Sequence, residues 1–184
     1  ALFQGVVYLL LRDATVEPAD LTRYLIVGLL GFYLVIGLVV AVPLLRDTRL
    51  RWGDGDRAIA ALLGVGTGGS LAALLLGVQL LIEGQVTSDQ NAVLMMSEGT
   101  FAHVAATFLI VVVAAPLVEE VLFRGLLLEA LRRRGPQLAI LVSAMAFSAW
   151  HLNLSAWRYY LLAGLILGTL YVKRGLVASM AAHA

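Results

Sequence analysis

The stretch VEEVLFR at residues 118–124 places two carboxylates and an arginine inside an apolar run that extends from Phe108 to Leu128. An ionised side chain at the centre of a bilayer costs roughly 2.5–3.5 kcal/mol on insertion scales. The three charges therefore need one another, a hydrated cavity or a function. An ion pair that only holds helices together is the simpler interpretation. We favour a functional site, because intramembrane ionisable residues are functional by default.

A helix through this stretch separates successive residues by about 100° and gives the two carboxylates different surroundings. Glu120 and Arg124 are an i, i+4 pair and can neutralise each other. Glu119 points to a neighbouring face, one turn from Phe123, without a local cation. We therefore predict that Glu120 is the structural partner of Arg124 and that Glu119 is free to act as a general base.

The composition is that of a membrane protein. Apolar residues make up 61% of the 184 residues, charged residues 14%, and the mean hydropathy is +0.92. A soluble domain is nearer half apolar and a quarter charged. We predict an all-α, polytopic transmembrane helix bundle that forms a single integral membrane domain over residues 1–184.

Two classes of function are excluded by composition. The chain has no cysteine, so disulfides, thiolate metal sites and cysteine nucleophiles are ruled out. Its net charge is +1, and no basic run carries the interleaved aromatic residues of a nucleic-acid surface. The lipid bilayer is the expected environment, and no nucleic-acid partner is expected. Because the sequence stops directly after His183 and Ala184, we expect a truncated C-terminus.

Apolar segments alternate with polar connections along the whole chain. The segments are Gln4–Leu11, Tyr24–Leu45, Ala58–Ile82, Phe101–Leu131, Leu138–His151, Tyr159–Val172 and a last one from Leu176 onward. Phe101–Leu131 is too long for one upright span, so it must tilt, break near Pro116 or protrude. The pairs Gly64/Gly68 and Gly164/Gly168 are spaced for close helix packing.

The basic residues predict the orientation in the membrane. If the connections alternate sides, one side receives nine basic residues, including Arg132–Arg134, and the other receives three. Lysine and arginine are enriched in cytoplasmic loops. The Arg132–Arg134 loop is therefore predicted to be cytoplasmic, in a multi-pass protein of a prokaryotic plasma membrane.

Counting along the helices predicts which residues lie at the same depth. Glu119 precedes Arg132 by 13 residues, about 20 Å, and His151 follows Gln137 by 14 residues, about 21 Å. On adjacent antiparallel helices these two side chains are level and can meet. His183 lies about 12 Å above the turn that precedes its segment, which predicts the height of Arg124 instead.

Three motifs in order resemble a known family. They are Glu119-Glu120-x-x-x-Arg124, Phe147-x-x-x-His151 and a glycine-bearing segment that ends at His183. Together they resemble the CAAX protease and bacteriocin-processing enzyme family (CPBP) of intramembrane endopeptidases. The resemblance covers about residues 115–184. In that family the third motif is His-x-x-x-Asn or similar, and the second residue of this pair would fall at position 187, beyond the chain.

The resemblance implies hydrolysis of a peptide bond in a membrane-associated peptide or protein, of the prenylated CAAX type or the bacteriocin and leader type. It makes Glu119 the general base and His151 its partner in holding the attacking water. It assigns a bracing role to Glu120 and Arg124, a supporting role to Phe123 and Phe147, and oxyanion stabilisation to His183. No cofactor is certain, but Glu119, His151 and His183 would also be a three-ligand set for a divalent metal such as zinc. The motif spacing does not decide between the two mechanisms.

Two interpretations from other classes stay open. One is a non-catalytic scaffold or immunity protein of the same fold, in which the charges only brace helices. The other is a small transporter with Glu119 as a proton relay. His151 and His183 favour the protease, because a brace neutralised by arginine needs no histidine. A transporter would be expected to show a sequence repeat, and none is visible.

Overall fold

The computed structural model describes residues 28, 31–38, 50–53, 55–83, 101–154 and 156–184. The predicted segment Gln4–Leu11 and most of Tyr24–Leu45 lie outside these residues. Throughout the described part of the chain the regular structure is helical, and no strand is present there. This confirms the all-α class for the described residues.

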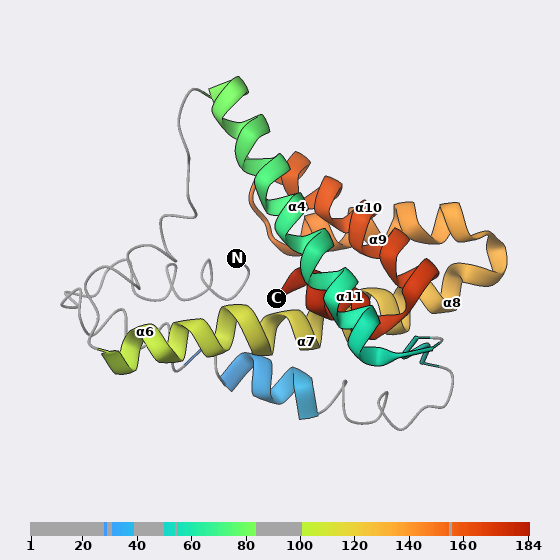
Figure 1. The fold of residues 1–184 in the computed structure, drawn as a ribbon, viewed down its shortest axis with the longest axis horizontal. Coiled ribbons are helices and arrows are strands. Elements are labelled where there is room, and N and C mark those ends of the chain that lie inside the picture. Colours follow the sequence, from blue (N-terminus) through green and yellow to red (C-terminus); the bar gives the residue numbers. More distant parts are fainter. Residues whose placement is uncertain (1–27, 29–30, 39–49, 54, 84–100, 155) are drawn as a thin grey trace.

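The described helices form a bundle in which segments far apart in sequence lie side by side (Figure 1). Residues 31–38 form a short helical segment. The helices that follow are α4 (Arg57–Glu83), α6 (Phe101–Phe108), η2 (Leu109–Ala114), α7 (Ala115–Glu120), η3 (Val121–Leu128), α8 (Glu129–Leu131), η4 (Arg132–Arg134), α9 (Pro136–Trp150), α10 (Trp157–Arg174) and α11 (Leu176–His183). Two stretches, Arg57–Val78 and Val104–Arg134, are long and apolar enough to cross a membrane.

The long apolar segment that begins at Phe101 does not break at Pro116. It continues as one helical rod whose winding changes from α to π in η2 and η3, on either side of α7. A proline inside a regular helix lacks an N–H donor and its ring collides with the carbonyl four residues earlier. The wider π-helical turns directly before α7 accommodate that ring, and such π segments are frequent at functional sites.

Glycines with positive φ set the turns between the C-terminal helices. Gly135 has φ 132° and precedes Pro136 at the start of α9, and Gly175 has φ 86° between α10 and α11. Gly175 also lies so close to Gly53 that a Cβ there would overlap the backbone of Gly53. The backbone N–H of Leu176 donates to the carbonyl of Arg51 at 2.8 Å, which anchors the start of α11 to the loop before α4.

Both predicted glycine pairs lie in close helix contacts. A Cβ on Gly64 or Gly68 would overlap the backbone of Ala178 or Ala182, so α4 packs directly on α11. A Cβ on Gly164 would lie 2.8 Å from Cα of Ala144, where α10 packs on α9. The prediction of close packing faces is confirmed, and these contacts accompany the approach of α11 to α7 and of α10 to η3.

The contact between α4 and α11 predicts a large difference between two glycines of the same helix. Gly68→Ala should lower the free energy of unfolding by about 1–3 kcal/mol, because the new methyl collides with the Ala182 carbonyl. Gly66→Ala is the matched control, since nothing lies within 4 Å of a Cβ at that position. Thermal melts in detergent compare the melting temperatures of the two variants. Equal melting temperatures would contradict the assignment of Gly68 to the face that packs on α11.

Candidate active site

Glu120 and Arg124 form an ion pair that is completely buried. Both side chains are 0% exposed, and Nη1 of Arg124 lies 2.9 Å from Oε1 of Glu120, which confirms the predicted pairing. The contact is an ion pair rather than a well-directed hydrogen bond. Nη2 of Arg124 donates to the carbonyl of Gly164 at 3.4 Å, and the guanidinium lies 4.5 Å from the centre of the Phe147 ring.

Two further side chains from α11 converge on the Glu120 carboxylate. The Ser179 hydroxyl donates to Oε2, and Nδ1 of His183 lies 2.9 Å from Oε1. Ser179 precedes His183 by one helical turn, so one face of α11 presents both groups. The carboxylate therefore has partners on its own helix and on α11, as a buried charge requires.

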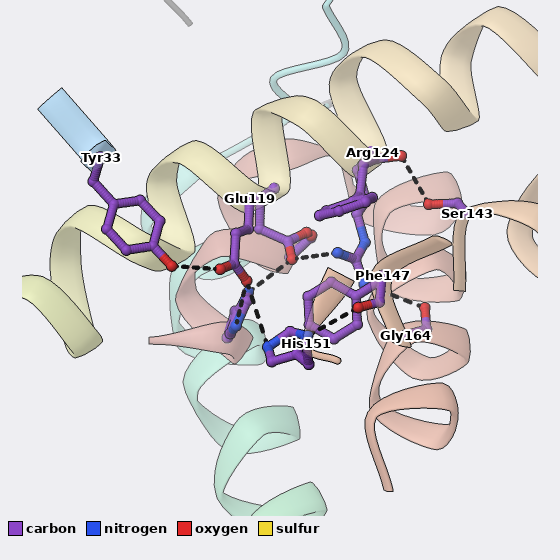
Figure 2. A network of polar contacts seen from close by, with 11 residues as sticks. Tyr33, Glu119, Arg124, Ser143, Phe147, His151 and Gly164 are labelled. Carbon is purple, nitrogen blue, oxygen red and sulfur yellow. Dashed lines mark hydrogen bonds and ion pairs between the residues drawn. The ribbon is translucent and has the colours of Figure 1, made fainter. Parts of the chain in front are cut away.

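Glu119 faces the imidazoles of His151 and His183, and Figure 2 shows its contact with His151. Its Oε2 lies 4.0 Å from Nε2 of His151 and 3.8 Å from Nε2 of His183, and its side chain is buried. The predicted meeting of Glu119 and His151 at one depth is confirmed. The groups converge from α7, from the end of α9 and from the end of α11.

The predicted height of His183 is wrong, because that count assumed that α11 starts at the level of Arg132. Leu176, the first residue of α11, instead packs in one buried cluster with Leu128. Glu119 lies about 13 Å from the level of Leu128, and His183 lies about 10 Å from Leu176. The turn at Gly175 is thus deeper in the bundle than the Arg132–Arg134 turn, and His183 reaches Glu119.

His151 is held in one orientation by its neighbours. Its Nδ1 lies 2.8 Å from the carbonyl of Phe147, and a carbonyl only accepts, so we assign the ring proton to Nδ1. In the neutral ring Nε2 is then an acceptor that faces Glu119. The imidazole stacks on Tyr160 at 3.9 Å and lies edge-on to Phe147 at 4.7 Å between centroids.

Phe147 borders both histidines. Its ring centre lies 5.5 Å from that of His183 and 5.5 Å from that of Phe123, in edge-to-face arrangements. Phe147 and Phe123 are both buried. Phe147 therefore packs beside the His151 imidazole, and Phe123 packs in turn on Phe147.

Sequence reasoning missed three residues at this site. The Tyr33 hydroxyl donates to Oε1 of Glu119 at 2.8 Å, Ser179 donates to Glu120, and Tyr160 stacks on His151. Ser179 could have been found, because it lies four residues before His183 on the same helix face. Nothing in the sequence pattern predicts the contacts of Tyr33 and Tyr160, which depend on tertiary packing.

Comparison with protein families identifies the part of the chain that carries these groups. Residues 101–184 match the model of a family described as type II CAAX prenyl endopeptidase Rce1-like. We refer to residues 101–184 as the Rce1-like segment. The match confirms the family resemblance seen in the three motifs. The description of the matched family names endopeptidases. Comparisons with curated proteins and with solved structures found no match for the chain.

A zinc site in the Rce1-like segment would need three protein ligands around one open position. Glu119, His151 and His183 do converge, but no group of three His, Cys, Asp or Glu side chains within the described residues is arranged to hold a metal ion. Nδ1 of His183 already binds Glu120, and its Nε2 is 3.8 Å from Oε2 of Glu119. The three-ligand metal set therefore stays a prediction.

The two carboxylates of the Rce1-like segment should respond differently to the same substitution. Glu120→Gln leaves the Arg124 charge buried without its counter-ion, so we expect a loss of up to about 3–5 kcal/mol in the free energy of unfolding. Glu119→Gln should leave stability nearly unchanged, because the amide has the same shape and its oxygen still accepts from Tyr33. Thermal melts of both variants measure the difference. Equal destabilisation would show that the structural role is shared.

Proposed function

We propose that this protein is an intramembrane endopeptidase in which Glu119 and His151 activate a water molecule that attacks a peptide bond. The observation that carries the proposal is the position of Oε2 of Glu119, which faces Nε2 of His151 at 4.0 Å and Nε2 of His183 at 3.8 Å. The endopeptidase description of the matched family supports the reaction class.

The gap between Glu119 and His151 suits one water molecule. A carboxylate oxygen and the unprotonated nitrogen of a neutral imidazole are both acceptors, so they do not hydrogen bond to each other. At 4.0 Å they are close enough for a single water to donate a proton to each. Such a water keeps its oxygen lone pairs free for attack on a carbonyl carbon.

Glu119 then acts as the general base. It takes a proton from the water while the water oxygen bonds to the carbonyl carbon, and it returns the proton to the amine as the peptide bond breaks. General-base catalysis contributes about 10²–10⁴-fold in rate. The base must carry no strong salt bridge of its own, and Arg124 is paired with Glu120 instead.

His183 is assigned to the oxyanion and Glu120 to holding His183. For this role Nε2–H of His183 donates a hydrogen bond to the developing negative charge, while Nδ1–H donates one to Glu120 at 2.9 Å. The buried carboxylate thus orients the ring, as carboxylates do for catalytic histidines. Arg124 braces Glu120 in turn. Phe147 and Phe123 support the rings.

We place the site in a multi-pass protein of a prokaryotic plasma membrane, with the Arg132–Arg134 loop in the cytoplasm. Glu119 then lies about 20 Å from that end of its helix, roughly two-thirds of the way across a 30 Å hydrocarbon core. Water must reach this depth through a protein-lined path. The substrate is a membrane-associated peptide or protein, prenylated at a CAAX-type end or of the bacteriocin and leader type.

Glu119→Gln tests the mechanism directly. The amide cannot take a proton, so cleavage should fall by about 10²–10⁴-fold in an assay with a panel of prenylated and unprenylated peptides. Glu129→Gln is the matched control, because Glu129 pairs with Arg132 and Tyr171 outside the site. Treatment with a strong zinc chelator should leave wild-type activity unchanged.

Three outcomes would oppose this assignment. Full activity of Glu119→Gln would remove the general-base role, and loss of wild-type activity on chelation would favour a metal mechanism. A wild-type protein that cleaves no peptide of the panel would favour the non-catalytic scaffold.

The depth of the site predicts a preference for unfolded substrate segments. A helical backbone ties up its carbonyls in internal hydrogen bonds, so an extended tail should be cleaved faster than an intact transmembrane helix. One scissile sequence can be placed in a flexible tail and in a stable poly-leucine helix, and the two rates compared in the same vesicles. Faster cleavage of the intact helix would refute the preference.

A further inference from the structure

The helical segment 31–38 packs against the site although it lies outside the Rce1-like match. The Phe32 ring stacks on Trp150 at 6.0 Å between centroids, next to His151 at the end of α9. A Cβ on Gly37 would be 3.7 Å from the Val118 side chain, so this segment also contacts α7 (Figure 1). Phe32 thus contacts the end of α9 and Gly37 contacts α7, and the Tyr33 hydroxyl reaches Glu119 of α7.

Tyr33 and the two histidines occupy different oxygens of the Glu119 carboxylate. The Tyr33 hydroxyl donates to Oε1 at 2.8 Å (Figure 2), while Oε2 faces both imidazoles. The last torsion of a glutamate side chain is broad and roughly two-fold, so packing alone does not fix the direction of its oxygens. A donor on one oxygen does fix it.

We infer that Tyr33 is a positioning residue of the active site. Its hydroxyl holds Oε1 of Glu119 so that Oε2 stays aimed at the water between Glu119 and His151. The inference rests on the proposed function of Glu119 as general base. It also makes the N-terminal segment part of the site, because the groups of the Rce1-like segment receive this hydrogen bond from outside it.

The expected signature of Tyr33→Phe is a loss in kcat without a change in KM. Loss of the hydroxyl lets the carboxylate rotate, and small misplacements of a reacting group or the removal of an orienting partner cost about 10–100-fold in rate. The phenyl ring keeps its edge-on contact with Phe32, so folding and substrate binding should not change.

Tyr171→Phe is the matched control. It removes the same kind of hydrogen bond, from a tyrosine hydroxyl to Oε2 of Glu129 at 3.1 Å, near the Arg132–Arg134 turn and away from the site. Wild type, Tyr33→Phe, Tyr171→Phe and Glu119→Gln are compared as full chains in the same detergent. For each protein we would measure kcat and KM with one peptide substrate, and the melting temperature.

The inference is supported if Tyr33→Phe alone of the two tyrosine variants lowers kcat about 10–100-fold at constant KM and melting temperature. Unchanged kcat, a higher KM at constant kcat, or equal losses in both tyrosine variants would overturn it. A melting temperature lowered by Tyr33→Phe, or failure of this variant to fold, would show a stabilising role instead and would also overturn it. Full activity of Glu119→Gln would mark failure of the proposed mechanism itself, whatever the result for Tyr33.

Discussion

The buried ion pair of Glu120 and Arg124 is the interaction on which the rest of the described structure depends. Both side chains are 0% exposed, and neither charge can be left alone in an apolar interior without a cost of several kcal/mol. The carboxylate oxygens of Glu120 therefore need further hydrogen-bond donors, and Ser179 and His183 of α11 supply them. The need to neutralise the buried Glu120 carboxylate thus also brings His183 next to Glu119.

Close backbone packing is what lets these short side chains reach Glu120. A serine hydroxyl extends only one bond beyond Cβ, so α11 must approach α7 closely for Ser179 to donate to the carboxylate. On a neighbouring face of α11, about 100° away, Gly64 and Gly68 let α4 lie directly against the backbone of the same helix. Gly164 has a similar effect on α10, where close contact with Ala144 brings its own carbonyl to Arg124. The glycine pairs and the ion pair are parts of one arrangement.

Helix periodicity and counting predicted the local part of the site correctly. The pairing of Glu120 with Arg124 and the meeting of Glu119 with His151 follow from regular geometry along one helix and one short hairpin. The position of His183 did not follow, because it depends on how deep the Gly175 turn lies, and that depth is set by backbone contacts with Arg51 and Gly53. Tyr33 was beyond sequence reasoning for a similar reason: it contacts Glu119 across 86 positions of the chain. Assignment to a multi-pass topology stays a prediction, as does the cytoplasmic loop.

Adjacent carboxylates can serve different purposes because a helix turns by about 100° between them. Glu120 faces the interior of the bundle, where an arginine, a serine and a histidine neutralise it and make it part of the framework. Glu119 faces the histidines and a tyrosine hydroxyl, which are groups that can share or direct a proton without a permanent opposing charge. A second arginine beside Glu119 would stabilise the bundle further but would weaken the carboxylate as a base. The separation of roles therefore requires that the only permanent cation at this depth among the described residues be bound to Glu120, and that the partners of Glu119 be weaker ones drawn from several helices.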